Sequence, residues 1–297
     1  MVVAWTALQN VTNNNKSRDR KMPTEITLDT GTNELLCVIR DRVAIITLNR
    51  PEARNALSDH LTPGLRRMIK ACGENPDVGA VLITGAGTAF CAGGDVKGMG
   101  AHRDPNKLAM SQEEKVADLR ERQRLLTGAL YGLRKPTIAA LPGPAAGAGL
   151  AIALACDIRI AAQSAFVATG YVRIGLSGDY GIAWLLTKLV GTARARELMF
   201  SGEKVDADRC AQIGLVNRVV PDERLQDEAF ALARSLAEGP ALALRAMKDN
   251  LDDAQTLDFD AARDREAERL IPLTTTADHK EAVQAFIEKR KAAFKGK

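Results

Sequence analysis

The sequence is poor in the residues that build metal sites and disulfide frameworks. Its 297 residues include only three histidines, which lie far apart and so argue against a metal cluster. The five cysteines form an odd, scattered set without C-x-x-C spacing: Cys37, Cys72, Cys91, Cys156 and Cys210. We therefore expect buried free thiols in a reducing compartment, the cytoplasm, with no disulfide and no bound metal.

A strong charge of one sign and a long apolar run are also missing. The net charge is +4, basic and acidic residues are interspersed, and aromatic residues make up 4% of the chain. A nucleic-acid-binding protein concentrates its basic residues in patches, often with aromatic residues between them. No apolar run approaches the roughly 18 residues that a membrane span needs. We therefore expect neither nucleic acid nor a membrane as a partner.

The chain does have the composition of a protein with a sizeable core, with 46% hydrophobic and 26% charged residues. For residues 1–24, which become rich in Asn, Lys and Arg, a disordered tail is predicted. From residue 25 to 222 strand and helix patterns alternate, which indicates an α/β core. From residue 223 to 297 only helical patterns follow, interrupted near Gly239 and Pro272. The sequence thus predicts an α/β core and an all-helical C-terminal region.

The stretch from Leu133 to Asp157 organises the predicted core. It indicates a buried strand over Thr137–Leu141, a Pro/Gly turn, and a helix that is apolar on every side. A helix N-terminus offers unpaired N–H groups and a partial positive charge, which suit a carbonyl oxygen that gains negative charge. Gly147 and Gly149 would let a ligand approach the backbone there. The alternative is a tight strand-to-helix turn whose glycines serve packing only.

A second stretch, from Val81 to Met99, repeats this arrangement. A strand over residues 81–84 leads into a glycine-rich turn that contains Cys91, Gly94 and Asp95. Two such turns in one domain, each with backbone N–H groups, would hold one carbonyl between them.

With these motifs in collinear order, the sequence resembles the crotonase superfamily, also called the enoyl-CoA hydratase/isomerase family. The resemblance runs from about Leu35 to the C-terminus. The matching residues are Asn49-Arg50-Pro51, Asn55-Ala56-Leu57, Phe90 to Asp95, Lys135-Pro136, Gly143, Gly147, Gly149, Cys156-Asp157, Ile174-Gly175-Leu176, 211–216 and 286–290.

The resemblance implies a crotonase-like spiral of ββα repeats, with a C-terminal helical region that assembles a homotrimer or a dimer of trimers. It also implies an acyl thioester of coenzyme A as substrate and no further cofactor. The N–H groups of Gly94 and Ala148 would polarise the thioester carbonyl and stabilise the enolate that forms when the alpha carbon loses a proton. The family usually has glycine at the second position. Alanine keeps the N–H, provided that the backbone does not need a positive φ there.

Hydratases of this family carry two glutamates, and neither is present here. The first position falls at Ala151 and the second at Tyr171, a phenol that would contact the acyl group but is a poor base. Asp179 remains, at a position where isomerases of dienoyl-CoA and of aromatic-acid degradation carry aspartate. The resemblance therefore favours an isomerase that moves a proton with Asp179. Alternatively, Asp179 caps the helix that begins near Ile182, or acts as a nucleophile, as in the aroyl-CoA dehalogenase branch.

The same resemblance assigns residues to the coenzyme A moiety. Arg54 matches a contact to the phosphate-bearing arm, and the backbone around Ala53 and Ala92 would face the pantetheine and adenine. Phe286 and Lys289 match positions that touch the adenosine end, sometimes from a neighbouring subunit. Ordinary charge on a helix surface is the alternative for Lys289.

Three other interpretations stay open. One is an enoyl-CoA hydratase (a lyase) of fatty acid β-oxidation, which the missing glutamates disfavour, and another is a catalytically silent CoA-binding member. A dinucleotide-binding protein fits worse, because Ile152 stands where the fingerprint needs Gly or Ala and Asp157 comes too early. The acyl group itself is not readable, since loops such as Gly98–Pro105 would build its pocket.

Overall fold

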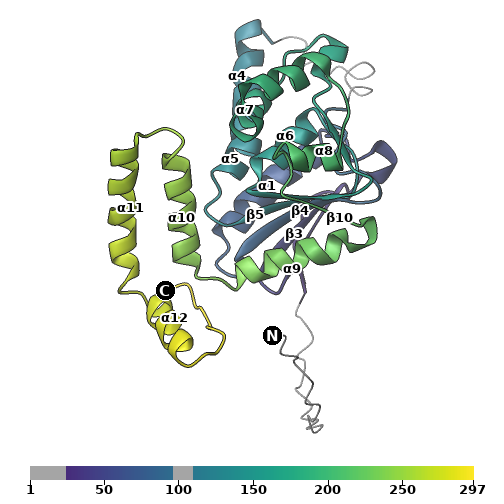
Figure 1. Cartoon of the computed structure of the whole chain (residues 1–297). Coiled ribbons are helices and arrows are strands. Elements are labelled where there is room, and N and C mark those ends of the chain that lie inside the picture. The colour runs from purple at the N-terminus through teal and green to yellow at the C-terminus, as the bar shows by residue number, and fades with distance from the viewer. Residues whose placement is uncertain (1–24, 96–109) are drawn as a thin grey trace, which may run out of the picture.

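The computed structural model describes residues 25–95 and 110–297. The tail predicted for residues 1–24 and the loop at Gly98–Pro105 lie outside these ranges. The described part has an α/β core with two sheets and a group of helices at its C-terminal end (Figure 1). This confirms the α/β class that the alternation of strand and helix patterns predicts.

The larger sheet has seven strands in the order β1-β2-β3-β4-β5-β7-β10. The first three strands pair antiparallel and the remaining pairs are parallel. The bounds are β1 (Ile26–Thr27), β2 (Leu35–Arg40), β3 (Val43–Leu48), β4 (Ala80–Gly85), β5 (Thr137–Leu141), β7 (Ile158–Ala162) and β10 (Arg218–Val220). β4 and β5 are buried along their whole length, as expected for parallel strands covered on both faces.

The hairpin of β2 and β3 turns at Asp41 and Arg42. Both residues have positive φ, 48° and 65°. Two central residues with positive φ form the type of two-residue turn whose twist matches that of the flanking strands.

A smaller sheet lies beside the first. It has the order β6-β8-β9, with β6 (Ala145–Ala146), β8 (Phe166–Ala168) and β9 (Val205–Asp206). β6 stands directly before α6 (Ala148–Ala155), so the smaller sheet fixes the entry to the buried helix. All eight residues of α6 are buried, which agrees with its apolar sequence.

Helices cover both faces of the larger sheet. α1 (Leu61–Glu74) packs on β2 and β3, and α9 (Leu225–Ala237) packs on β4 and β5 from the opposite side (Figure 1). α4 (Gln112–Gln123) continues through the π-helical η2 (Arg124–Gly128) into α5 (Ala129–Tyr131). The other core elements are η1 (Pro51–Ala53), η3 (Tyr171–Ile174), α7 (Ile182–Ser201), α8 (Ala207–Gln212) and η4 (Asp222–Arg224).

The predicted cysteine environment is also confirmed. All five cysteines are buried free thiols. Each lies in the hydrophobic core, where a thiol packs as a small apolar group.

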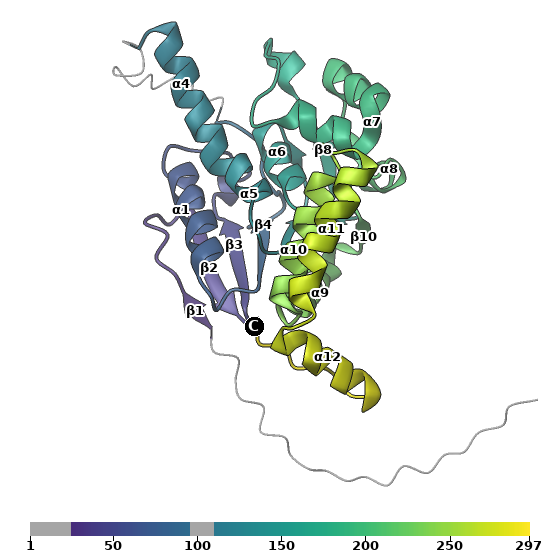
Figure 2. The same ribbon diagram turned by 90° about the vertical axis from the view of Figure 1, so that its left-hand side faces the viewer.

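The C-terminal helices are α10 (Ala241–Asp253), α11 (Phe259–Leu273) and α12 (Ala277–Ile287). Secondary structure becomes all-helical near the predicted boundary at 222/223, but α9 still packs on the sheet as part of the core. α10 and α11 pair side by side, and α12 extends beyond them (Figure 2). By packing, the C-terminal helical region therefore separates from the α/β core only after α9, at Gly239 and Pro240.

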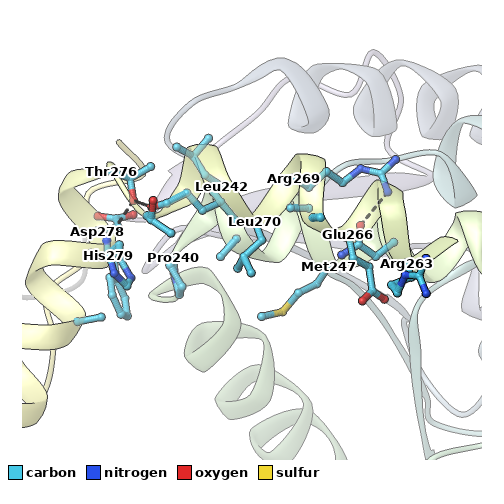
Figure 3. Close-up of a pocket in the computed structure, with 18 residues that line it drawn as sticks. Pro240, Leu242, Met247, Arg263, Glu266, Arg269, Leu270, Thr276, Asp278 and His279 are labelled. Carbon is cyan, nitrogen blue, oxygen red and sulfur yellow. Dashed lines mark hydrogen bonds between the residues drawn. The ribbon is translucent and has the colours of Figure 1, made fainter. Parts of the chain in front are cut away.

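Polar contacts hold α10 to the core. The Arg134 guanidinium contacts Asp249 at 2.7 Å and Asp252 at 2.9 Å, and Lys248 Nζ lies 2.8 Å from Asp157. A cavity of about 610 Å³ remains between α10, α11 and α12 (Figure 3). None of the residues predicted for catalysis lines this cavity, so it is a gap between helices and not the predicted site. No helix in the two described ranges is long and apolar enough to cross a membrane.

The C-terminal helices expose a set of large apolar side chains. Phe286 is 84% exposed, and several others on α10 to α12 are more than half exposed: Met247, Leu251, Phe259, Leu270, Ile271 and Ile287. Monomeric soluble proteins rarely expose such a large apolar set. The homotrimer predicted from the resemblance would cover these side chains.

We therefore expect multi-angle light scattering to give the mass of a trimer or of a dimer of trimers. The double substitution Leu270→Asp and Ile271→Asp on α11 should shift the protein to smaller species, because it places charge in the apolar contact. Leu36→Asp, at an exposed apolar position of β2, serves as the control and should leave the mass unchanged. A monomeric wild-type protein would contradict the expectation.

Candidate active site

Two backbone turns meet at the carboxyl ends of adjacent strands. β4 leads to the turn that contains Gly94, and β5 leads to the first turn of α6. Because β4 and β5 pair as parallel neighbours, their carboxyl ends lie at the same edge of the sheet. The turns are joined by a bridge between Cys91 and Ala145 and by a 2.9 Å bond from Ala146 N–H to the Cys91 carbonyl. The fold thus brings together the two turns that the sequence singles out.

The Ala148 N–H points out of the N-terminus of α6. Ala148 is the first residue of that helix, where N–H groups have no partner within the helix. The unusual backbone conformation falls on Gly147, with φ 52° and ψ −126°, which a side chain would oppose. Ala148 itself is not among the residues with positive φ. Alanine is therefore compatible with an N–H donor at this position.

The Gly94 N–H belongs to the turn that lies against the start of α6. Leu57 donates to the Gly93 carbonyl at 2.8 Å and accepts from the Asp95 N–H at 3.3 Å. Successive N–H groups of an extended segment point to opposite sides, so the Gly94 N–H points away from Leu57. A Cβ atom on Gly93 would lie 3.5 Å from the Ala148 nitrogen, which shows how close the turns are. Within the described residues, neither N–H donates to a backbone carbonyl.

Three of the residues predicted for coenzyme A form the rim of this turn. Ala92 N–H donates to the Arg54 carbonyl at 2.9 Å, and Ala53 ends the short η1 next to it. Arg54 is exposed and has a positive φ of 50°. The structure therefore places Arg54, Ala53 and Ala92 together beside Gly94.

Asn55 holds the rim in place, a role that the sequence analysis did not assign. Its side chain is fully buried, accepts from the Arg50 N–H at 2.8 Å, and donates to the carbonyls of Ala86 and Ala89. A buried amide bonded on both sides fixes the loops that it joins. The Asn55-Ala56-Leu57 motif was the feature of the sequence that could have indicated this role.

Asp179 is hydrogen-bonded to Tyr171. The Tyr171 hydroxyl donates to Asp179 Oδ1 at 2.5 Å, within the range of a charge-assisted O–H···O⁻ bond. Tyr171 also lies against the α6 turn, since a Cβ atom on Gly147 would be 3.9 Å from its hydroxyl oxygen. Tyr171 therefore lies between the Asp179 carboxylate and the N-terminus of α6, bonded to the first and packed against the second.

Burial shifts both ionisable groups of this pair. Desolvation raises the pKa of Asp179 above its usual value, and the hydrogen bond from Tyr171 acts in the opposite direction. Burial, the hydrogen bond to Asp179 and the nearby carboxylate charge all raise the pKa of Tyr171. Tyr171 is thus a neutral donor at physiological pH, and Asp179 is the group of the pair whose pKa lies nearer neutrality.

The alternative role of Asp179 as a helix cap is wrong. α7 begins at Ile182, but its N-cap is Gly181, with φ 75° and no side-chain cap. Asp179 contributes only its backbone carbonyl, which accepts from the Ile182 N–H at 3.1 Å. The carboxylate is turned toward Tyr171 because Gly178, Tyr180 and Gly181 all have positive φ and bend the chain sharply.

The other predicted positions divide into two groups. Ala151 lies in the first turn of α6 and is fully buried, so this position offers no carboxylate. Phe286 and Lys289 lie in and just after α12, which is far from α6 in both views of the chain (Figures 1 and 2). A single chain therefore does not bring them to the site, and contact from a neighbouring subunit stays a prediction.

The chain is similar to known proteins of one family. A family model described as enoyl-CoA hydratase/isomerase matches residues 39–297. The chain is 36% identical over 267 residues to 1,2-epoxyphenylacetyl-CoA isomerase of Escherichia coli, which covers 89% of this chain and 98% of that protein. It is 34% identical over 255 residues to crotonyl-CoA hydratase of Syntrophomonas wolfei, which covers 86% and 95%.

The chain belongs to the enoyl-CoA hydratase/isomerase family. A solved enoyl-CoA hydratase structure from Polaromonas superposes with a TM-score of 0.81 at 31% identity, covering 88% of this chain and 99% of the other. The crotonase fold implied by the resemblance is thereby confirmed. Family membership supports an enzyme that acts on acyl-CoA, and the relatives include both isomerases and hydratases by name.

The position of Asp179 predicts an unusual stability effect. The pKa of Asp179 is higher in the folded state than in the unfolded chain. The folded protein therefore loses stability as the pH rises from the unfolded-state pKa to the folded-state pKa. Asn does not titrate, so Asp179→Asn should melt no lower than wild type at neutral pH. Any stabilisation should vanish at a pH below the ordinary pKa of aspartate. Differential scanning calorimetry at several pH values measures this.

Asp206 provides the matched control, because its side chain does cap a helix. Its carboxylate accepts from the Arg209 N–H at 2.8 Å at the start of α8. Asp206→Ala should cost about 1 kcal/mol, the usual loss for a cap. A clear drop in melting temperature for Asp179→Asn would show a structural role instead.

Proposed function

We propose that the protein is an acyl-CoA isomerase that moves a proton between carbon atoms of an enoyl-, dienoyl- or aryl-acetyl-CoA thioester, with Asp179 as the acid–base group. The observation that carries the proposal is the half-buried Asp179 carboxylate, which is held by Tyr171 beside the N-terminus of α6. A carboxylate in a partly desolvated site is a stronger base than one in water, which suits it to take a proton from carbon.

The backbone would supply the second part of the mechanism. The thioester carbonyl accepts hydrogen bonds from the N–H groups of Gly94 and Ala148, and the N-terminus of α6 favours the negative charge that develops. Asp179 takes a proton from one carbon, and the electrons of that C–H bond move into an enolate. The carboxylic acid then returns the proton to another carbon of the same conjugated system. Neither step consumes water.

Three features support an isomerase over a hydratase. Ala151 cannot act as an acid or base, and its side chain is fully buried. The Tyr171 hydroxyl is bonded to Asp179 as a neutral donor, so it does not replace the second glutamate. One of the relatives has the name of an isomerase, although others have the names of hydratases.

Removing the Ala148 N–H tests the proposed oxyanion site. Ala148 is the first residue of α6, where proline is tolerated because that N–H has no partner in the helix. Ala148→Pro should fold but lose turnover by about 10²–10³-fold, the usual loss for one oxyanion donor. Steady-state kinetics with the best acyl-CoA substrate measures this.

Ala277→Pro is the control, because Ala277 is the exposed first residue of α12. It introduces the same residue at the same helical position away from Gly94. Full activity in Ala148→Pro would rule out this N–H as a donor to the substrate.

Substrate preference tests the choice between isomerase and hydratase. Wild-type protein should hydrate crotonyl-CoA far more slowly than it isomerises its best enoyl-, dienoyl- or aryl-acetyl-CoA thioester. Asp179→Asn should bind acyl-CoA as wild type does and lose isomerisation by about 10²–10⁴-fold, the contribution of a general base. Rapid crotonyl-CoA hydration that survives in Asp179→Asn would refute both the isomerase activity and the role of Asp179.

A further inference from the structure

We propose that Tyr171 is the positioning residue of the proton shuttle: it binds Asp179 Oδ1 and leaves Oδ2 as the one oxygen that exchanges a proton with the substrate. The inference rests on the proposed isomerase function and deepens it by assigning separate roles to the two carboxylate oxygens.

The hydroxyl of Tyr171 is held in a fixed place. Tyr171 is 7% exposed, and its carbonyl accepts from the Leu176 N–H at 3.0 Å, which closes the turn around η3. The ring packs against Gly147, where an added Cβ would lie 3.8 Å from its Cζ atom. Since core packing and a closed turn both fix the ring, its hydroxyl can orient the carboxylate that it binds.

The backbone of Asp179 is fixed independently. The flanking residues Gly178 and Tyr180 have φ of 115° and 52°, and the Tyr180 N–H donates to Gln123 Oε1 at 3.0 Å. A tyrosine with positive φ persists only where the surroundings impose it. The turn therefore fixes the position of the Asp179 backbone, and the hydrogen bond from Tyr171 fixes the orientation of its carboxylate. Within residues 25–95 and 110–297, Oδ2 has no hydrogen-bond partner.

Among the residues that the structure describes, few charges lie around the pair. Tyr180, the next residue, contacts Arg66 of α1 and lies near Arg122 of α4, and burial raises its pKa while Arg66 lowers it. The direct partner of the carboxylate is the neutral Tyr171 hydroxyl. A donor without charge stabilises the carboxylate by less than an arginine would, so the carboxylate keeps its basicity and gains a fixed orientation.

The two oxygens then have different tasks in the reaction. Oδ2 forms an O–H bond as the substrate C–H bond breaks, and the C–H electron pair moves into the enolate. In the second step the O–H bond breaks and the proton goes to the other carbon. The Tyr171 O–H stays intact throughout and donates to Oδ1 in every state. No other reactant is consumed.

Tyr171→Phe is the decisive variant, because it keeps the buried ring and removes only the hydroxyl. The pKa of Asp179 should rise when its donor is lost, so the acid limb of the kcat/KM profile should move up by about one pH unit, as expected for a hydrogen bond to a charged group. We also expect kcat to fall about tenfold or more while KM changes little. The substitution removes the orientation of the carboxylate and leaves the contacts that bind the substrate in place.

Infrared difference spectra of wild type and Asp179→Asn report the ionisation of Asp179 without any turnover. In the Tyr171→Phe background the same titration should move to higher pH, in step with the kinetics. Tyr131→Phe is the control: it removes another half-buried hydroxyl, which accepts from Gln255 at 3.2 Å, and should change neither readout.

The outcomes separate the two proposals. An unchanged pH profile together with an unchanged titration of Asp179 in Tyr171→Phe would overturn the positioning role. If Asp179→Asn keeps full turnover, the isomerase function proposed for Asp179 fails, and the infrared titration still decides whether Tyr171 controls this carboxylate. A shifted titration with an unshifted kinetic profile would also overturn the inference, because the titrating group would then not be the shuttle.

Discussion

The close contact between the first turn of α6 and the turn at residues 91–95 is the constraint on which the site depends. A Cβ atom on Gly149 would come within 2.4 Å of the Cys91 carbonyl oxygen, so only glycine lets the two backbones meet. β4 and β5, which pair as parallel neighbours in one sheet, lead into the two turns. The relative position of the Gly94 and Ala148 backbones is thus set by buried contacts between the two turns.

Asp179, the proposed acid–base group, lies by contrast on a strained and partly exposed segment. Asp179 lies between residues with positive φ, and burial opposes its charge. Such a group lowers the stability of the folded protein, which is common where a side chain is retained for chemistry. Tyr171 connects this segment to the rigid half of the site, because its ring packs at Gly147 while its hydroxyl holds the carboxylate. The Tyr171 side chain thus connects the α6 turn to the Asp179 carboxylate.

Much of the fold was predictable because local patterns and tertiary packing agree. The hairpin at Asp41 and Arg42, the strand Thr137–Leu141 and the glycine turns all carry strong local signals. The assignment of α9 to the sheet was not predictable, since its amphipathic pattern does not reveal which surface it covers. The bond between Tyr171 and Asp179 was also missed. It depends on backbone bends at Gly178 and Gly181 that composition does not encode, and for the same reason the sequence left capping open as an alternative.

The central claim is that the substrate exchanges a proton with Asp179 and never gains water. Turnover in water enriched in heavy oxygen, with the product analysed by mass spectrometry, tests it most directly. The account predicts a product of unchanged mass, with its double bond or ring rearranged and no solvent oxygen in the acyl chain. A hydroxyacyl-CoA product that carries one heavy oxygen would contradict it, because water would then be a reactant in the site formed by Gly94, Ala148 and Asp179.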